Sequence, residues 1–182
     1  KYRHYFLKEN EIHQKMIAAG QKPRYVDHSR SKTYLKASTQ VCLEILKTKI
    51  NFSSLDKVYY FLGYNADEGG NRTEAVRYYK TLVSKFPSSV YAPEAKRNIG
   101  ENEFAHKKYK DAVYWYERAV AHTDLPSFPR TLYKLAWSYF KTKQYSKALT
   151  SMKKVAAIAA TENKYVGLRE EALNDLVAFY TE

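Results

Sequence analysis

The sequence has almost no cysteine, and this limits its redox chemistry. Cys42 is the only one, so an internal disulfide bond is excluded. It lies in the apolar run Val41–Leu43, which predicts a buried structural thiol. A chain nearly free of cysteine fits the cytosol, and it fits equally a bacterial envelope protein that does without disulfides.

Long hydrophobic runs are also missing. The longest candidate, 155–160, falls far short of the roughly 20 residues that a membrane-spanning helix needs. The sequence therefore predicts no transmembrane segment, and 45% hydrophobic with 27% charged residues is globular composition. There is no initiator Met or signal peptide, and residues 1–4 read as the middle of a helix, so we interpret the chain as trimmed or processed.

Patterns typical of catalysis and metal binding are missing as well. There is no Gly-rich phosphate loop, no HExxH and no CxxC, and Gly69-Gly70 alone predicts a turn. Glu9 and His13 have i,i+4 spacing, but two groups do not make a metal site. We therefore expect no enzyme activity, no catalytic residue, no cofactor and no metal.

Acidic residues are scarce in two parts of this chain of net charge +12. Residues 1–36 carry nine Lys/Arg against three acids, and residues 129–160 carry seven against none. Such basic patches indicate an acidic partner surface, an anionic polymer or an anionic membrane. General solubility is the alternative explanation.

What the sequence does contain is an internal repeat. A small residue follows an apolar one three times, at spacings of 37 and 36 residues, and an alanine comes twelve residues after each small one. The small residues and alanines are Gly63, Gly100, Ala136, Ala75, Ala112 and Ala148. Two antiparallel helices need small residues where their axes come closest, so the pattern predicts helix hairpins.

This pattern resembles the tetratricopeptide repeat, whose consensus has Trp-Leu-Gly-Tyr on the first helix and Ala-Phe-Ala-Pro on the second. The matching positions of the best repeat are Tyr59, Leu62, Gly63, Ala75, Tyr79, Leu82 and Pro87. The resemblance covers residues 56–160 as three repeats. No repeat has the consensus Trp, and Ala66 and Glu103 replace the consensus Tyr in two of them.

The resemblance implies an all-α fold: a right-handed superhelical solenoid of antiparallel helix hairpins with about nine helices. We expect one helical-repeat domain over residues 1–182. Its parts are a divergent N-terminal hairpin (1–54), three repeats (55–92, 93–128 and 129–164) and a capping helix or truncated repeat (165–182). Helices are expected near 2–21, 31–50, 55–67, 71–86, 92–106, 108–122, 129–142, 145–160 and 166–180.

In this family, side chains of each first helix line a concave groove that binds protein partners. Carried over by register, with neighbouring lysines added, the predicted groove residues are Tyr60, Tyr64, Arg97, Glu101, Arg130, Tyr133, Lys134, Trp137 and Lys141. Tyr, Trp and Arg dominate binding hot spots. The alternative is that some of these aromatic side chains pack between hairpins.

The sequence thus predicts a non-enzymatic scaffold that binds a partner peptide or domain. The alternative is a basic repeat that binds an anionic polymer: nucleic acid, which we favour least, cell-wall polymer or an anionic membrane surface. Residues 168–180 resemble proteobacterial cell-envelope repeat proteins, including those of gliding-motility machinery. This favours a bacterial periplasmic or outer-membrane-associated complex, with the cytoplasm as the alternative location.

Overall fold

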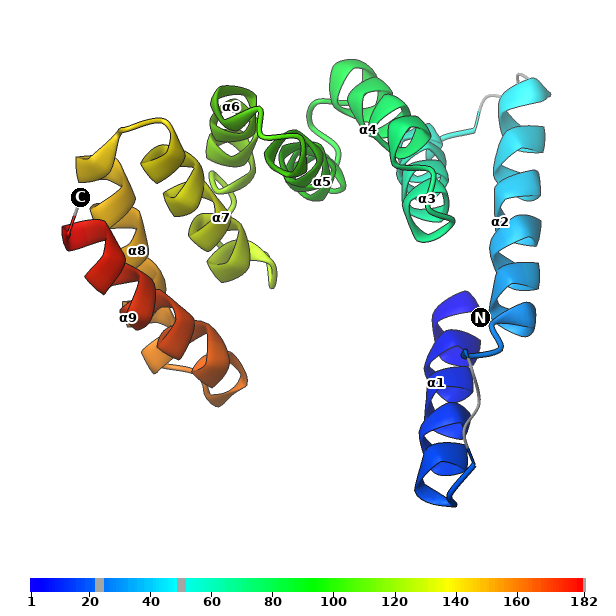
Figure 1. Cartoon of the computed structure of the whole chain (residues 1–182). Helices are drawn as coiled ribbons and strands as arrows, with labels where there is room; N and C mark the ends of the chain where they lie inside the picture. The colour runs from blue at the N-terminus through cyan, green and yellow to red at the C-terminus, as the bar shows by residue number, and fades with distance from the viewer. Residues whose placement is uncertain (22–24, 49–51, 182) are drawn as a thin grey trace. The chain divides into compact units, whose positions relative to one another are not determined.

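The computed structural model describes residues 1–21, 25–48 and 52–181. Within these ranges the chain forms nine α-helices and a short 3-10 turn, Asn163–Tyr165, and the helices pack as sequential hairpins (Figure 1). The helices are α1 (Tyr2–Ala18), α2 (Ser29–Lys47), α3 (Leu55–Glu68), α4 (Arg72–Lys85), α5 (Ala92–Ala105), α6 (Tyr109–Ala119), α7 (Phe128–Lys141), α8 (Tyr145–Ala160) and α9 (Val166–Tyr180). The predicted all-α hairpin fold is confirmed.

The chain divides into two compact units, Lys1–Tyr78 and Tyr79–Glu182. The division falls inside α4, so it does not coincide with a predicted repeat boundary. Each predicted repeat nevertheless contains one helix pair, because α3, α5 and α7 begin at or one residue before the expected starts. The expected end of the second helix, at residue 50, lies outside the described residues. No helix in the described ranges combines the length and apolar character needed to cross a bilayer.

The turns between the two helices of a repeat share one geometry. Gly70, Lys107 and Lys143 have positive φ angles of 82°, 59° and 62°. In each turn the N–H of that residue and the next N–H close back onto the preceding helix, as in Lys143 N to Phe140 O (3.0 Å) and Gln144 N to Tyr139 O (2.9 Å). This is the Schellman pattern, in which a left-handed residue ends the helix. The three residues with positive φ are therefore 37 and 36 residues apart, the same spacings as those of the small residues in the repeat.

A lysine at such a position strains the backbone, because a positive φ is sterically unfavourable for a residue with a Cβ. We expect Lys143→Gly to raise the free energy of unfolding by about 0.5–1 kcal/mol. Lys110→Gly, inside α6, is the matched control and should lower it by about 1 kcal/mol. Urea unfolding of both variants checks this, and equal losses in the two would contradict the strained-turn interpretation.

In the second unit one hydrophobic core joins α6, α7, α8 and α9. Each of these helices packs on the next, and Figure 1 shows α7, α8 and α9 side by side. The small residues of the repeat are enclosed here: Gly100 is buried, and Ala112, Ala136 and Ala148 are completely buried. At Gly100 the predicted close approach of the paired helices is confirmed, because a Cβ there would lie 2.8 Å from the Tyr116 ring. Large neighbours such as Met152 fill the remaining space.

In the first unit the core is smaller. Cys42, Val58, Leu62 and Tyr78 form a buried cluster from α2, α3 and the middle of α4. Cys42 is the buried thiol that the sequence predicts, and burial raises its pKa. The apolar side chains of α1 do not add to this core, because α1 has no buried residue, and Ile12 is 50% exposed.

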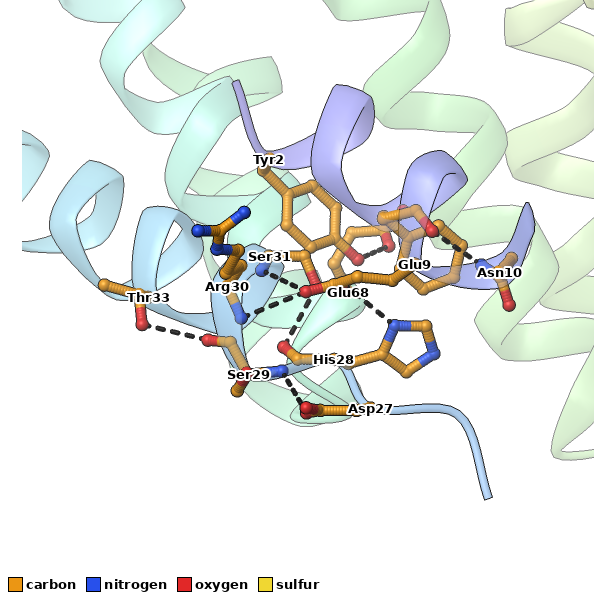
Figure 2. A network of polar contacts seen from close by, with 11 residues as sticks. Tyr2, Glu9, Asn10, Asp27, His28, Ser29, Arg30, Ser31, Thr33 and Glu68 are labelled. Carbon is orange, nitrogen blue, oxygen red and sulfur yellow. Dashed lines mark hydrogen bonds and ion pairs between the residues drawn. The ribbon is translucent and has the colours of Figure 1, made fainter. Parts of the chain in front are cut away.

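A polar network and stacked aromatic rings together tie α1 to α2. The Glu9 carboxylate accepts backbone hydrogen bonds from Arg30 N (3.0 Å) and Ser31 N (3.2 Å) at the first turn of α2, and its other oxygen lies 3.3 Å from His28 Nδ1 (Figure 2). The first N–H groups of a helix have no partner within it, so a carboxylate from another helix serves as the cap. Tyr2 Oη donates to Glu68 Oε2 at 2.6 Å, which connects α1 to α3 as well.

This cap makes the docking of α1 depend on pH. Burial acts to raise the pKa of Glu9, but the hydrogen bonds from Ser31, His28 and Arg30 outweigh it and hold the pKa below its ordinary value of 4.5. The stabilisation is therefore present above the unfolded-state pKa and disappears as pH falls through the lower folded-state pKa. We expect Glu9→Gln to cost about 1 kcal/mol at pH 7, and to cost progressively less as pH falls below 4.

Amide hydrogen exchange at Arg30 and Ser31 measures this effect directly, because these two N–H groups are the donors. Exchange should accelerate in Glu9→Gln at neutral pH. The control is Glu11→Gln, since Glu11 is exposed and pairs only with Lys15 on its own helix among the described contacts. Equal protection in wild type and Glu9→Gln would show that the carboxylate is not the cap.

Candidate functional site

Five of the predicted groove residues lie on one face of α7. Arg130, Tyr133, Lys134, Trp137 and Lys141 follow helical spacings of three and four residues, which places them along one side. Arg130 and Lys141 are exposed, and the other three are half-buried. This face combines two aromatic rings with three cations.

The two aromatic side chains on this face are held by α9. Tyr133 Oη and Trp137 Nε1 both donate to Asp175 Oδ2, at 2.7 and 2.8 Å. The Trp137 ring meets the Phe179 ring edge-on, with centroids 5.0 Å apart. Burial, and then the hydrogen bond to Asp175, raises the pKa of Tyr133 to about 12, so this hydroxyl stays a donor. Packing and hydrogen bonds therefore fix both rings, while their half-buried state leaves part of each accessible.

The cations of α7 stand beside aromatic rings. Lys141 Nζ lies 5.4 Å from the centroid of the Trp137 ring. Lys134 Nζ lies 5.1 Å from the centroid of the Phe104 ring on α5. These distances are within the range of cation–π attraction. The Lys134 contact joins α5 and α7 into a shared surface, which we call the α5–α7 face and define by Arg97, Glu101 and the five α7 residues.

On α5, Arg97 and Glu101 belong to a row of charges. Glu94 Oε1 accepts from Arg97 Nε (2.9 Å) and Nη2 (2.7 Å), and Arg97 Nη1 lies 3.9 Å from Glu101 Oε1. Burial acts against the charged guanidinium, but the hydrogen bonds to Glu94 dominate and raise the pKa of Arg97. Ser127 Oγ donates to Glu94 Oε2 at 2.8 Å. Arg97 is thus committed to the fold, and it presents only part of its charge to a partner.

Tyr60 and Tyr64 lie on α3, in the first unit, and both are half-buried. The Tyr2 ring of α1 meets the Tyr64 ring edge-on, with centroids 6.4 Å apart. Burial and the nearby Glu68 carboxylate raise the pKa of Tyr64 to about 12. The Tyr60 ring contacts Phe61, with centroids 5.8 Å apart. Tyr60 and Tyr64 belong to the first unit, whereas the α5–α7 face belongs to the second.

Two functional contributions were missed from the sequence. Asp175 organises Tyr133 and Trp137, although it is not among the groove residues predicted from the sequence. A signal was available, because Asp175 lies three residues after Ala172 and four before Phe179, both of which are buried. The other miss is Glu9, whose role depends on a contact with α2 that is distant in sequence.

The acidic side chains of the described residues do not gather into a metal site. No group of three or more His, Cys, Asp or Glu side chains with metal-binding geometry occurs in the described part of the chain. Glu103, which stands where the repeat consensus has Tyr, is buried, and its carboxylate lies 3.6 Å from Lys80 Nζ and 3.9 Å from Lys108 Nζ. The Glu103 carboxylate thus forms ion pairs within the fold.

Comparison with protein families gives two matches. The family model described as tetratricopeptide repeat matches residues 58–89. The model described as anaphase-promoting complex, cyclosome, subunit 3 matches residues 105–166. No curated protein matches the chain by sequence.

Solved structures share the fold over most of the chain. A kinesin light chain-like protein of Podosopora anserina with nearly identical TPR-like repeats has a TM-score of 0.62 at 18% identity, covering 97% of this chain and 86% of that one. BtubC (BKLC) of P. vanneervenii has a TM-score of 0.66 at 14% identity, covering 85% and 68%. MamA (residue 41 to the end) of Desulfovibrio magneticus RS-1 has a TM-score of 0.54 at 19% identity, covering 81% and 91%. Residues 58–89 thus match the tetratricopeptide repeat, and the chain shares the fold of solved TPR-like repeat proteins.

Proposed function

We propose that the chain is a non-enzymatic scaffold that binds a protein partner, as a peptide or a domain, through the α5–α7 face. The observation that carries the proposal is the pair Tyr133 and Trp137, fixed in place by Asp175 and flanked by the exposed cations Arg130 and Lys141. Aromatic side chains that are already ordered lose little entropy on binding. Their contact area and polar atoms make them suitable hot spots.

The test is affinity purification from native lysate with nuclease added, at low and moderate salt. We expect a defined protein, whose recovery falls at least tenfold for the double variant Arg130→Glu, Lys141→Glu. Both residues are exposed, so the variant should keep its fold. The control is Lys107→Glu, Lys110→Glu, which changes the same charge at exposed positions of the α5–α6 hairpin. Equal recovery with all three proteins would overturn the proposal.

We further propose that this scaffold belongs to a multiprotein complex of a bacterial envelope, in the periplasm or at the outer membrane. Support comes from the resemblance of residues 168–180 to proteobacterial cell-envelope repeat proteins. Fractionation of the native host into cytoplasm, periplasm and membranes, followed by immunoblotting, tests the location. Recovery in the cytoplasmic fraction alone would refute it.

A second candidate function rests on the exposed lysines of α8 and of the turn before it. Lys143, Lys147 and Lys154 are exposed at spacings of four and seven residues, and residues 129–160 contain no acid. Lys147 Nζ lies 5.2 Å from the centroid of the Tyr139 ring, and Lys154 Nζ lies 5.5 Å from that of Phe128. A row of cations over aromatic rings favours an anionic polymer or membrane surface.

Sedimentation with vesicles of phosphatidylglycerol and phosphatidylcholine, and retention on isolated cell wall, test this second function. Binding should decline steeply with salt and should be lost in Lys147→Glu, Lys154→Glu. Binding that is insensitive to both would exclude it. The α5–α7 variant, Arg130→Glu with Lys141→Glu, separates the two surfaces.

A further inference from the structure

The first unit contains an open groove of about 690 Å³ that is separate from the α5–α7 face. One wall is the side of α2 that carries Lys32 and Lys36. The floor is apolar and includes Leu35, Leu62 and Tyr78, which are 8%, 1% and 8% exposed. This volume is typical of a site that holds a ligand rather than a surface irregularity.

The other lining residues of the groove are held by contacts within the fold. Tyr2 and Phe6 of α1 line it, and the Phe6 ring stacks on the His28 ring, with centroids 4.6 Å apart. Glu68 and Glu74 also line it: Glu68 accepts the hydrogen bond from Tyr2 (2.6 Å), and Glu74 pairs with Arg77 Nη2 (2.8 Å). The acidic groups of the groove thus have partners within the fold.

The two lysines on the α2 side of the groove, unlike its acidic groups, have no ion-pair partner among the described residues. Lys32 and Lys36 are exposed, and neither forms an ion pair with any described residue. They are four residues apart on one helix, so they stand about 6 Å apart along its axis. The groove therefore offers an apolar floor with two available positive charges along one edge.

We propose that this groove binds a short amphipathic helix of a protein partner, with its apolar stripe on the floor and two acidic side chains against Lys32 and Lys36. Acidic residues four apart on the incoming helix have the same 6 Å spacing as the lysines. A helix laid in an apolar groove is a common mode of peptide recognition. The charged edge sets the register of the helix, because the acidic lining residues Glu68 and Glu74 would repel acidic side chains placed beside them.

A library of 16-residue helical peptides, displayed on phage and selected against the full chain, tests the proposal. The stripe positions carry Leu, Ile, Phe or Met, and the flanking positions vary among Glu, Gln and Lys. We expect enrichment of Glu at one i,i+4 pair beside the stripe. No enrichment, or no preference for Glu at such a pair, would overturn the proposal.

The enriched peptide is then synthesised with a fluorescein label and measured by fluorescence anisotropy. Its affinity should fall at least tenfold for Lys32→Glu, Lys36→Glu, and should be restored when the two glutamates of the peptide become lysines. The control, Lys143→Glu, Lys147→Glu, should bind the original peptide as wild type does. Undiminished binding by the Lys32/Lys36 variant would show that the peptide occupies another site.

The groove and the α5–α7 face can fail independently, because their variants share no residue. Loss of the lysate partner in Arg130→Glu, Lys141→Glu with peptide binding intact would support both sites. A peptide that responds to the Arg130 and Lys141 changes but not to the Lys32 and Lys36 changes would assign it to the α5–α7 face and refute the groove.

Discussion

Replacing Gly100 by alanine should lower the free energy of unfolding of the second unit by about 1–3 kcal/mol. A Cβ at Gly100 would lie 2.8 Å from Cδ1 and from Cε1 of Tyr116, closer than real Cβ contacts. The Tyr116 ring is completely buried in the hairpin of α5 and α6, so it has no free space into which to turn. The loss should appear even though alanine favours a helix over glycine by about 1 kcal/mol. Gly100→Leu should cost about 3 kcal/mol or more.

Urea unfolding followed by tryptophan fluorescence is the suitable measurement. Trp115 and Trp137 are the two tryptophans of the chain, and both lie in the second unit, so the signal reports on that unit. Gly167→Ala is the matched control: Gly167 is also helical, and a Cβ there would meet nothing within 4 Å. It should leave stability unchanged or raise it by up to about 1 kcal/mol.

A double-mutant cycle sharpens the test. Tyr116→Leu removes the ring that the Cβ would strike, so Gly100→Ala should cost less in that background than alone. A neutral effect of Gly100→Ala in wild type would refute the inference that α5 and α6 approach closely at this position. The same cost in both backgrounds would also refute it.

Asp175→Ala is expected to destabilise the second unit by about 2 kcal/mol and to loosen α9. The substitution removes the one acceptor shared by Tyr133 Oη and Trp137 Nε1. An unsatisfied buried donor costs roughly 1–3 kcal/mol, and the half-buried state of these donors lets water recover part of it. Asp175→Asn should cost less, since its amide oxygen can still accept.

Tryptophan emission and hydrogen exchange report on this change together. In Asp175→Ala the emission of Trp137 should shift to longer wavelength, and amides of α9 should exchange faster. Glu170→Ala, at an exposed position of the same helix, is the control and should change neither. Unaltered stability in Asp175→Ala would mean that the hydrophobic packing of α9 holds it without the hydrogen bonds of Asp175.

The repeat made much of the second unit predictable. Gly100 and Ala136 recur at helix contacts where only a small residue fits, and such sites leave a periodic trace in one sequence. Asp175 left no such trace, because it acts once and joins side chains about 40 positions away in the chain. Its position on the buried stripe of α9 was visible, but its partners depended on how α7 and α9 pack.

The first unit was harder to predict for a different reason. Ile12 and Met16 have the spacing of a buried stripe, yet they are 50% and 37% exposed. Spacing shows that a helix has an apolar side, but it does not show what covers that side. Here Glu9 and Tyr2 set the position of α1 by hydrogen bonds, and the groove beside Lys32 and Lys36 follows from that placement. Single polar contacts of this kind have no periodicity to detect.

The shared turn geometry also determines where the chain tolerates insertions. Each turn within a repeat has three residues (69–71, 106–108 and 142–144), whereas the connections between repeats have six, eight and five (86–91, 120–127 and 161–165). One residue added within 142–144 would disrupt the helix-ending hydrogen bonds of Lys143 N and Gln144 N and disturb the docking of Ala148 and Met152 in the core. A tag or reporter belongs instead in 120–127, where length already varies and added residues leave the helix pairs in register.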